Sequence, residues 1–148
     1  MAKIRGCDIP EDLYYFLEKH SWAKPLGNGR VRVGVTVVAT KMAGNLSAVT
    51  PRSKRIGKEL ERGKSIGTME SSKYVGPIPS PVKGVLVAVN EALKDNPNLL
   101  VNDPYGEGWV AEMDVPDWET QKDELLTGQA ALDAYEAFME KEGFSCEG

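Results

Sequence analysis

The segment TMESSKYVGP contains the residues most suited to covalent chemistry. Lys73 follows Glu70, Ser71 and Ser72, and it lies where two segments with strand character meet. A lysine at the tip of a hairpin exposes its ε-amine to a modifying enzyme, while the flanking strands hold the backbone in a recognisable shape. An acyl group attached there would become a flexible arm, and the amide would remove the charge of the lysine. The sequence therefore makes Lys73 a candidate for covalent attachment, with Glu70, Ser71 and Ser72 as the residues that precede it.

Other motifs that suggest chemistry fail on spacing or context. GKELERGKS resembles a phosphate-binding loop, but five residues separate Gly57 from Gly63 where that motif has four, and a predicted strand follows instead of a helix. A serine nucleophile with Lys73 as its base would need a helix, which this segment does not favour. His20 is the only histidine and lies beside Trp22, a setting more typical of a structural residue. No catalytic constellation and no metal-ligand spacing is therefore expected.

Short strands separated by turn residues predict the domain that must position Lys73. In residues 21–35 the valines of GRVRVGV alternate with other residues after the turn sequence Gly27-Asn28-Gly29, which is typical of a hairpin. Further elements are expected as a short helix over 36–44 and as strands over 45–51, 64–71 and within 74–93. Many short strands at short spacing favour a small sandwich or flattened barrel.

The C-terminal region changes to a helical pattern. Asp117 is expected to cap a helix through Leu125, and Thr127 a second helix that Gly143 ends. The second helix should pack one apolar stripe against the sheet: Ala131, Leu132, Tyr135, Phe138 and Met139. The prediction is one domain over residues 1–148, with a core at about 14–115 and helices at about 117–143.

Composition and charge narrow the class of protein. Of the 148 residues, 41% are hydrophobic and 27% are charged, which is ordinary for a globular domain. No apolar run is long enough to cross a membrane, and the first residues do not resemble a signal peptide, so we expect a cytoplasmic protein without a membrane partner. Cys7 and Cys146 are expected to be reduced thiols with no role in folding, because two cysteines are too few for a disulfide scaffold. Participation of one thiol near Lys73 is the alternative.

The charge is unevenly distributed along the chain. Residues 1–102 carry 16 Lys and Arg against 9 Asp and Glu, whereas residues 103–148 carry 2 against 13. No aromatic residue interrupts the basic segment, so a nucleic-acid surface is not expected. The basic cluster of Arg52, Lys54, Arg55 and Lys58, or the acidic C-terminal helices, is instead predicted to contact partner proteins.

The chain resembles the H protein of the glycine cleavage system from about Tyr14 to Tyr135. The similarity rests on KHSW at 19–22, on Glu70-Ser71-Ser72-Lys73 after Gly63, and on the block ending in PYGEGW at 80–109. It implies a mainly β barrel-sandwich hybrid fold with appended helices, as in lipoyl and biotinyl carriers. It also implies a non-catalytic carrier in which lipoate on Lys73, added by lipoate ligase or lipoyl-assembly enzymes, acts as a swinging arm.

Two departures bear on the cargo of that arm. The family places acidic residues where this chain has Ser21 and Pro77, and those acids surround a cationic aminomethyl group. Their loss resembles the lipoate-binding proteins of the heterodisulfide-reductase-like sulfur-oxidation system, so we expect sulfur to be carried between sulfur-transfer and heterodisulfide-reductase-like enzymes. The alternative is an H protein that carries the aminomethyl group among glycine decarboxylase, aminomethyltransferase and dihydrolipoyl dehydrogenase. A third possibility is a relative without lipoate, in which Lys73 is only a turn residue.

Overall fold

Antiparallel strands dominate the computed structural model, which describes residues 2–146. The largest sheet has the strand order β3-β4-β5-β11-β10-β7, and a second has the order β6-β8-β9. The six strands of the first sheet are β3 (Tyr14–Phe16), β4 (Ser21–Gly27), β5 (Arg30–Val35), β11 (Ala111–Asp114), β10 (Gly84–Val89) and β7 (Glu59–Leu60). The other strands are β6 (Leu46–Pro51), β8 (Ser65–Ser71), β9 (Val75–Pro79) and the N-terminal pair β1 (Ala2–Ile4) and β2 (Cys7–Ile9).

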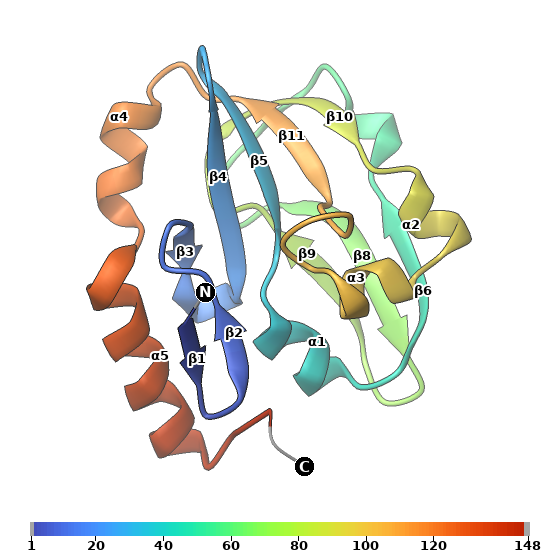
Figure 1. Cartoon of the computed structure of the whole chain (residues 1–148). Helices are drawn as coiled ribbons and strands as arrows, with labels where there is room; N and C mark the ends of the chain where they lie inside the picture. The colour runs from blue at the N-terminus through green and yellow to red at the C-terminus, as the bar shows by residue number, and fades with distance from the viewer. Residues whose placement is uncertain (1, 147–148) are drawn as a thin grey trace.

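Short helices connect the strands, and a longer one follows the sheets. The α-helices are α1 (Val37–Ala43), α2 (Ala92–Asp95), α3 (Asn98–Asn102), α4 (Trp118–Gln121) and α5 (Gly128–Glu142). Single 3₁₀ turns occur at Leu17–Lys19, Ser53–Arg55 and Lys122–Glu124. In Figure 1, α4 and α5 run along one side of the molecule, α2 and α3 lie on the opposite side, and α1 lies low in the view between them.

The main core lies between the two larger sheets. Val31, Val33 and Val35 of β5 are buried, as their alternation predicts, and they belong to one cluster with Ile66 of β8 and Ile78 of β9. This sheet arrangement confirms the expected mainly β, carrier-like fold with appended helices. The β4–β5 hairpin is confirmed as well, and its turn residues Gly27, Asn28 and Gly29 all have positive φ.

The C-terminal helices begin where expected, but not by the expected hydrogen bonds. Asp117 precedes α4, and Thr127 precedes α5, yet neither side chain caps its helix. The Thr127 hydroxyl donates to the carbonyl of Leu13 instead, at 2.7 Å, and so joins α5 to the N-terminal part of the chain. Four residues of the predicted stripe are buried in a second cluster with residues of β2, β3 and β4: Ala131, Leu132, Tyr135 and Met139.

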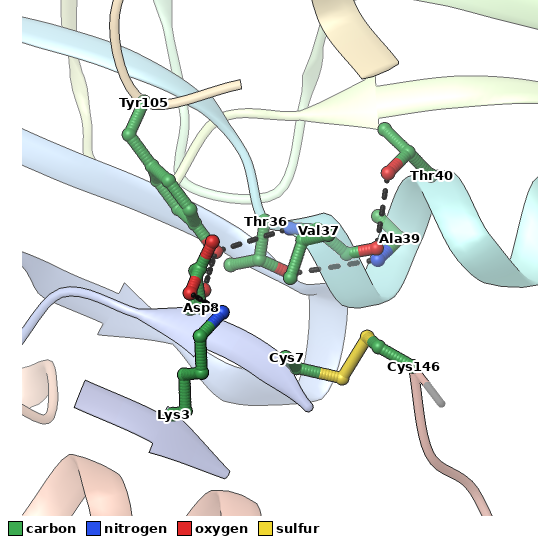
Figure 2. Close-up of a disulfide and its surroundings, with 9 residues drawn as sticks. All are labelled: Lys3, Cys7, Asp8, Thr36, Val37, Ala39, Thr40, Tyr105 and Cys146. Carbon is green, nitrogen blue, oxygen red and sulfur yellow. Dashed lines mark hydrogen bonds and ion pairs between the residues drawn. A yellow bond between two sulfur atoms is a disulfide. The ribbon is translucent and has the colours of Figure 1, made fainter. Parts of the chain in front are cut away.

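The two chain ends are joined covalently, so the prediction of reduced thiols is wrong. Cys7 and Cys146 form a disulfide with their Cα atoms 5.0 Å apart, as Figure 2 shows. The β1–β2 hairpin packs against α5, and the backbone N–H of Cys146 donates to the carbonyl of Arg5 at 3.0 Å. Packing of the two ends thus brings together thiols that are 139 positions apart in the sequence.

The described residues also bear on a membrane-spanning helix and on a metal site. Within residues 2–146 no helix has the length and apolar character needed to span a membrane. The same part of the chain has no cluster of three or more His, Cys, Asp or Glu side chains that could hold a metal ion.

Candidate functional site

Lys73 lies at the tip of the β8–β9 hairpin. Glu70 pairs with Val75 across the two strands, and the backbone N–H of Ser71 donates to the carbonyl of Tyr74 at 2.7 Å. Ser72 and Lys73 therefore form the exposed loop, which is the placement that the sequence predicts. The side chain of Lys73 thus extends from a backbone that β8 and β9 hold on both sides.

Ser71 connects the tip to helix α1. Its side chain is 6% exposed, and its hydroxyl donates to the carbonyl of Ala43 at 2.6 Å. The same oxygen accepts a bond from the backbone N–H of Lys73 at 3.4 Å. Glu70 and Ser72 are exposed, so among the three context residues Ser71 has a structural role and the other two are available to a partner.

Gly44, which ends α1, leaves room for the side chain of Lys73. Its φ is +87°, which favours glycine, and a Cβ built there would lie 2.9 Å from Cε of Lys73. The end of α1 thus positions the backbone of Lys73 through Ser71. The lack of a side chain at Gly44 leaves space for the side chain of Lys73.

A groove of about 490 Å³ begins beside this tip. Its walls come from the turn before β4, from α1 and from the β8–β9 hairpin, and they include Glu18, His20, Met42, Met69, Tyr74 and Pro77. Most of the wall is apolar, so it suits the hydrocarbon part of an arm attached to Lys73. Sequence reasoning missed Glu18 and Met42, because neither belongs to a motif and only the tertiary fold places them here.

The two positions that depart from the family pattern differ in their surroundings. Pro77 lines the groove, whereas Ser21 is fully buried. The Ser21 hydroxyl has no hydrogen-bond partner among the described residues. The preceding residue His20 and the paired residue Val35 of β5 both line the groove. Among the described residues, the groove lining nevertheless includes the carboxylate of Glu18.

His20 contributes a neutral ring to this wall. It adopts a left-handed backbone conformation with φ of +56°, and its ring packs against Phe138 with the centroids 4.9 Å apart. Its Nδ1 lies 3.4 Å from the hydroxyl oxygen of Tyr135. Burial lowers the pKa of His20 from 6.5 to about 4, so the imidazole carries no charge at neutral pH.

Comparison with known proteins assigns the family. The family described as Glycine cleavage H-protein matches residues 13–142. The chain belongs to the glycine cleavage H-protein family. It is 42% identical over 150 residues to Glycine cleavage system H protein 5 of Aquifex aeolicus (strain VF5), covering 99% of each chain. It is 40% identical over 149 residues to Probable glycine cleavage system H protein 2 of Sulfurisphaera tokodaii, with the same coverage.

A solved structure supports the same relationship. The crystal structure of a glycine cleavage system H protein from Mycobacterium marinum superimposes with a TM-score of 0.70 and 32% identity, covering 92% of this chain and 100% of that chain. H proteins are non-catalytic carriers with covalent lipoate on a lysine, so the expectation that this chain is not itself an enzyme is confirmed.

The H-protein block ending in PYGEGW has a structural role here. The carbonyl of Pro104 accepts a bond from Nε1 of Trp22 at 3.1 Å. The hydroxyl of Tyr105 donates to the carbonyl of Asp8 at 2.6 Å and accepts from the backbone N–H of Val37 at 3.1 Å (Figure 2). The loop therefore fixes the start of α1, and the other end of α1 holds the tip that bears Lys73.

Proposed function

We propose that this protein is a lipoyl carrier of the glycine cleavage type, with lipoate in amide linkage to Lys73. The observation that carries the proposal is the exposed residue Lys73 at a strand-held tip beside an apolar groove. When bound, lipoate supplies a dithiol that takes up and releases a small group. The chain itself supplies the attachment point and a surface on which the arm can rest.

Attachment uses the Lys73 amine as a nucleophile. Its Nζ forms a bond to the carboxyl carbon of a lipoate activated by a ligase, the activating group leaves with the bonding electrons, and one proton passes to solvent. Ser71 acts as a positioning residue, because its hydrogen bonds hold the backbone of Lys73 against the end of α1. The exposed Glu70 and Ser72 offer polar contacts to the modifying enzyme.

The cargo proposed for this arm is the aminomethyl group of glycine cleavage. Two observations support it: the relatives at about 40% identity are named glycine cleavage system H proteins, and Glu18 places a carboxylate on the groove. An ammonium group held by a carboxylate gains a charge-assisted hydrogen bond of about 1.5–3 kcal/mol. Glycine decarboxylase, aminomethyltransferase and dihydrolipoyl dehydrogenase would then be the partner enzymes.

Intact-mass spectrometry tests the attachment. Co-expression with a lipoate ligase and lipoate should add one lipoyl mass to the wild type. Lys73→Arg keeps the positive charge but cannot form the amide, so it should stay unmodified. A lipoyl mass that persists in Lys73→Arg would refute the assignment.

Transfer of sulfur remains a second candidate. It is favoured by Ser21 and Pro77, which stand where the family has the two acidic residues that surround the aminomethyl cation. A dithiol can exchange with persulfides and disulfides without an ammonium-binding carboxylate. The partners would then be sulfur-transfer and heterodisulfide-reductase-like enzymes.

Glycine–bicarbonate exchange separates the two cargoes. The lipoylated wild type should support exchange by glycine decarboxylase, and Glu18→Gln should support it more weakly. Glu136→Gln, which makes the same charge change at an exposed position of α5 outside the groove lining, is the matched control and should behave as the wild type. No exchange, together with uptake of sulfur from a persulfide donor, would select the second candidate.

A further inference from the structure

A second hollow lies on the outer side of the three-stranded sheet. Its volume is about 460 Å³, and it is lined by basic and hydroxyl side chains that include Thr50, Arg52, Lys54, Arg55, Thr68 and Lys94. Thr50 and Thr68 are exposed partners on β6 and β8, and the 3₁₀ turn Ser53–Arg55 brings the basic residues beside them. We call this the basic hollow.

The charges of the basic hollow are largely uncompensated. Of its cations, Lys94 has an ion pair, with Glu91 at 3.2 Å. Arg52, Lys54 and Arg55 are exposed and have no carboxylate within ion-pair distance in the part of the chain that the structure describes. Three exposed cations around a hollow attract a surface of negative charge.

The basic hollow and the turn that bears Lys73 are connected by strand β8. From Thr68 to Ser71 the rise along β8 is about 10 Å, and Lys73 follows in the turn. Glu70 is exposed on the same side, between the hollow and the tip. A typical protein interface covers about 800 Å² on each partner, a patch about 30 Å across. One interface of ordinary size therefore covers both the basic hollow and Lys73.

The unmodified lysine constrains which partner can sit there. Before attachment, Lys73 has only its own side chain to reach an active site, so the modifying enzyme must contact the β8–β9 hairpin close to its tip. Enzymes that act later receive the end of a longer arm. The outer sheet face, which continues along β8 to the tip, is thus a surface within reach of the lipoyl-attaching enzyme.

We propose that the basic hollow docks a carboxylate-rich surface of the enzyme that attaches lipoate to Lys73. This rests on the proposed function, namely that Lys73 is lipoylated. The alternating charge gives the contact a direction, because carboxylates of the partner face Arg52, Lys54 and Arg55 while a hydrogen-bond donor or cation faces Glu70. That order orients the partner so that its active site meets the tip.

The test measures lipoylation kinetics with a lipoate ligase and the unmodified protein. The test variant is Arg52→Glu/Arg55→Glu, and the control is Lys24→Glu/Lys141→Glu, which changes the net charge equally at exposed positions on β4 and α5. In low salt, about 0.05 M, the test variant should show a KM for the protein raised about tenfold with kcat unchanged. The control should match the wild type, and the difference should shrink near 0.5 M salt because exposed charges are then screened.

The outcomes separate the two proposals. A wild type that gains no lipoyl mass refutes modification of Lys73 and the docking proposal with it. A wild type that gains the mass, with equal KM values for the test and control variants, refutes docking at the basic hollow alone. Sedimentation that shows a dimer in the wild type and a monomer in Arg52→Glu/Arg55→Glu, with an unchanged KM, would assign the hollow to a second copy of this chain and overturn the proposal.

Discussion

Reduction of the Cys7–Cys146 disulfide should destabilise the fold substantially. The bond closes a loop of nearly the whole chain, with a sequence separation of 139. In the chain-entropy model a loop of this length contributes about 5 kcal/mol at 25 °C, and removal of a native disulfide from a small domain costs about 2–5 kcal/mol. A domain of this size changes its Tm by about 3 °C per kcal/mol, so reduction should lower the Tm by about 6–15 °C.

A single substitution that removes the disulfide should destabilise the protein as much as reduction does. Cys7 is fully buried in the second core cluster, whereas Cys146 is half-buried near the end of the chain. Cys146→Ala therefore opens the loop while it leaves the core residue in place. The variant without reductant and the wild type with reductant should unfold at the same urea concentration.

Urea unfolding followed by tryptophan fluorescence measures the effect. The reduced wild type should also show a larger m-value, because an unfolded chain without the cross-link exposes more surface. Reductant should not affect Cys146→Ala, which is the control. Two free thiols titrated in the native, unreduced protein, or identical unfolding midpoints with and without reductant, would refute the reasoning.

Three other predictions concern the site and its support. Because burial lowers the pKa of His20 to about 4, the folded state keeps the ring neutral while the unfolded chain binds a proton below pH 6.5. The free energy of unfolding should thus fall by up to about 3 kcal/mol as the pH drops from 6.5 through 4. In pH-dependent unfolding His20→Asn, which tolerates the left-handed backbone, should show a smaller fall. Gly44→Ala should cost about 1–3 kcal/mol through backbone strain and also slow lipoylation by crowding Lys73, whereas Gly57→Ala, with φ of +91° and open space, should show only the strain. Gly34→Ala should lower the free energy of unfolding by about 1–3 kcal/mol, because its Cβ would lie 2.6 Å from the buried tryptophan of β4.

Local patterns predicted the elements that present Lys73. Alternating valines and positive-φ turn residues specify the β4–β5 hairpin, and Gly44 ends α1 as expected. These features depend on neighbours within a few residues, so propensity and periodicity describe them well. The hydrogen bonds that begin the C-terminal helices were predicted less well. Thr127 begins a helix, yet its hydroxyl bonds to Leu13, a partner that local sequence does not reveal.

The PYGEGW block shows an intermediate case. Its resemblance to the family was visible in the sequence, but its physical role was not. Tyr105 bonds to Asp8 of β2 and to Val37 at the start of α1, and these contacts exist only because the chain folds back on itself. A recognised motif thus located an important loop without saying whether it binds a ligand or supports the structure.

The sequence by itself determined that a lysine in a Glu-Ser-Ser-Lys context lies at a strand-held turn, because that outcome depends on short-range backbone preferences. Only the tertiary structure decided that Cys7 pairs with Cys146 and that Glu18 shares a groove with Pro77. Such pairs are distant along the chain, and they meet through the packing of the N-terminal hairpin, α1 and α5 around the sheets. Contacts of this kind follow from the burial of apolar faces by the whole fold, which no short segment specifies on its own.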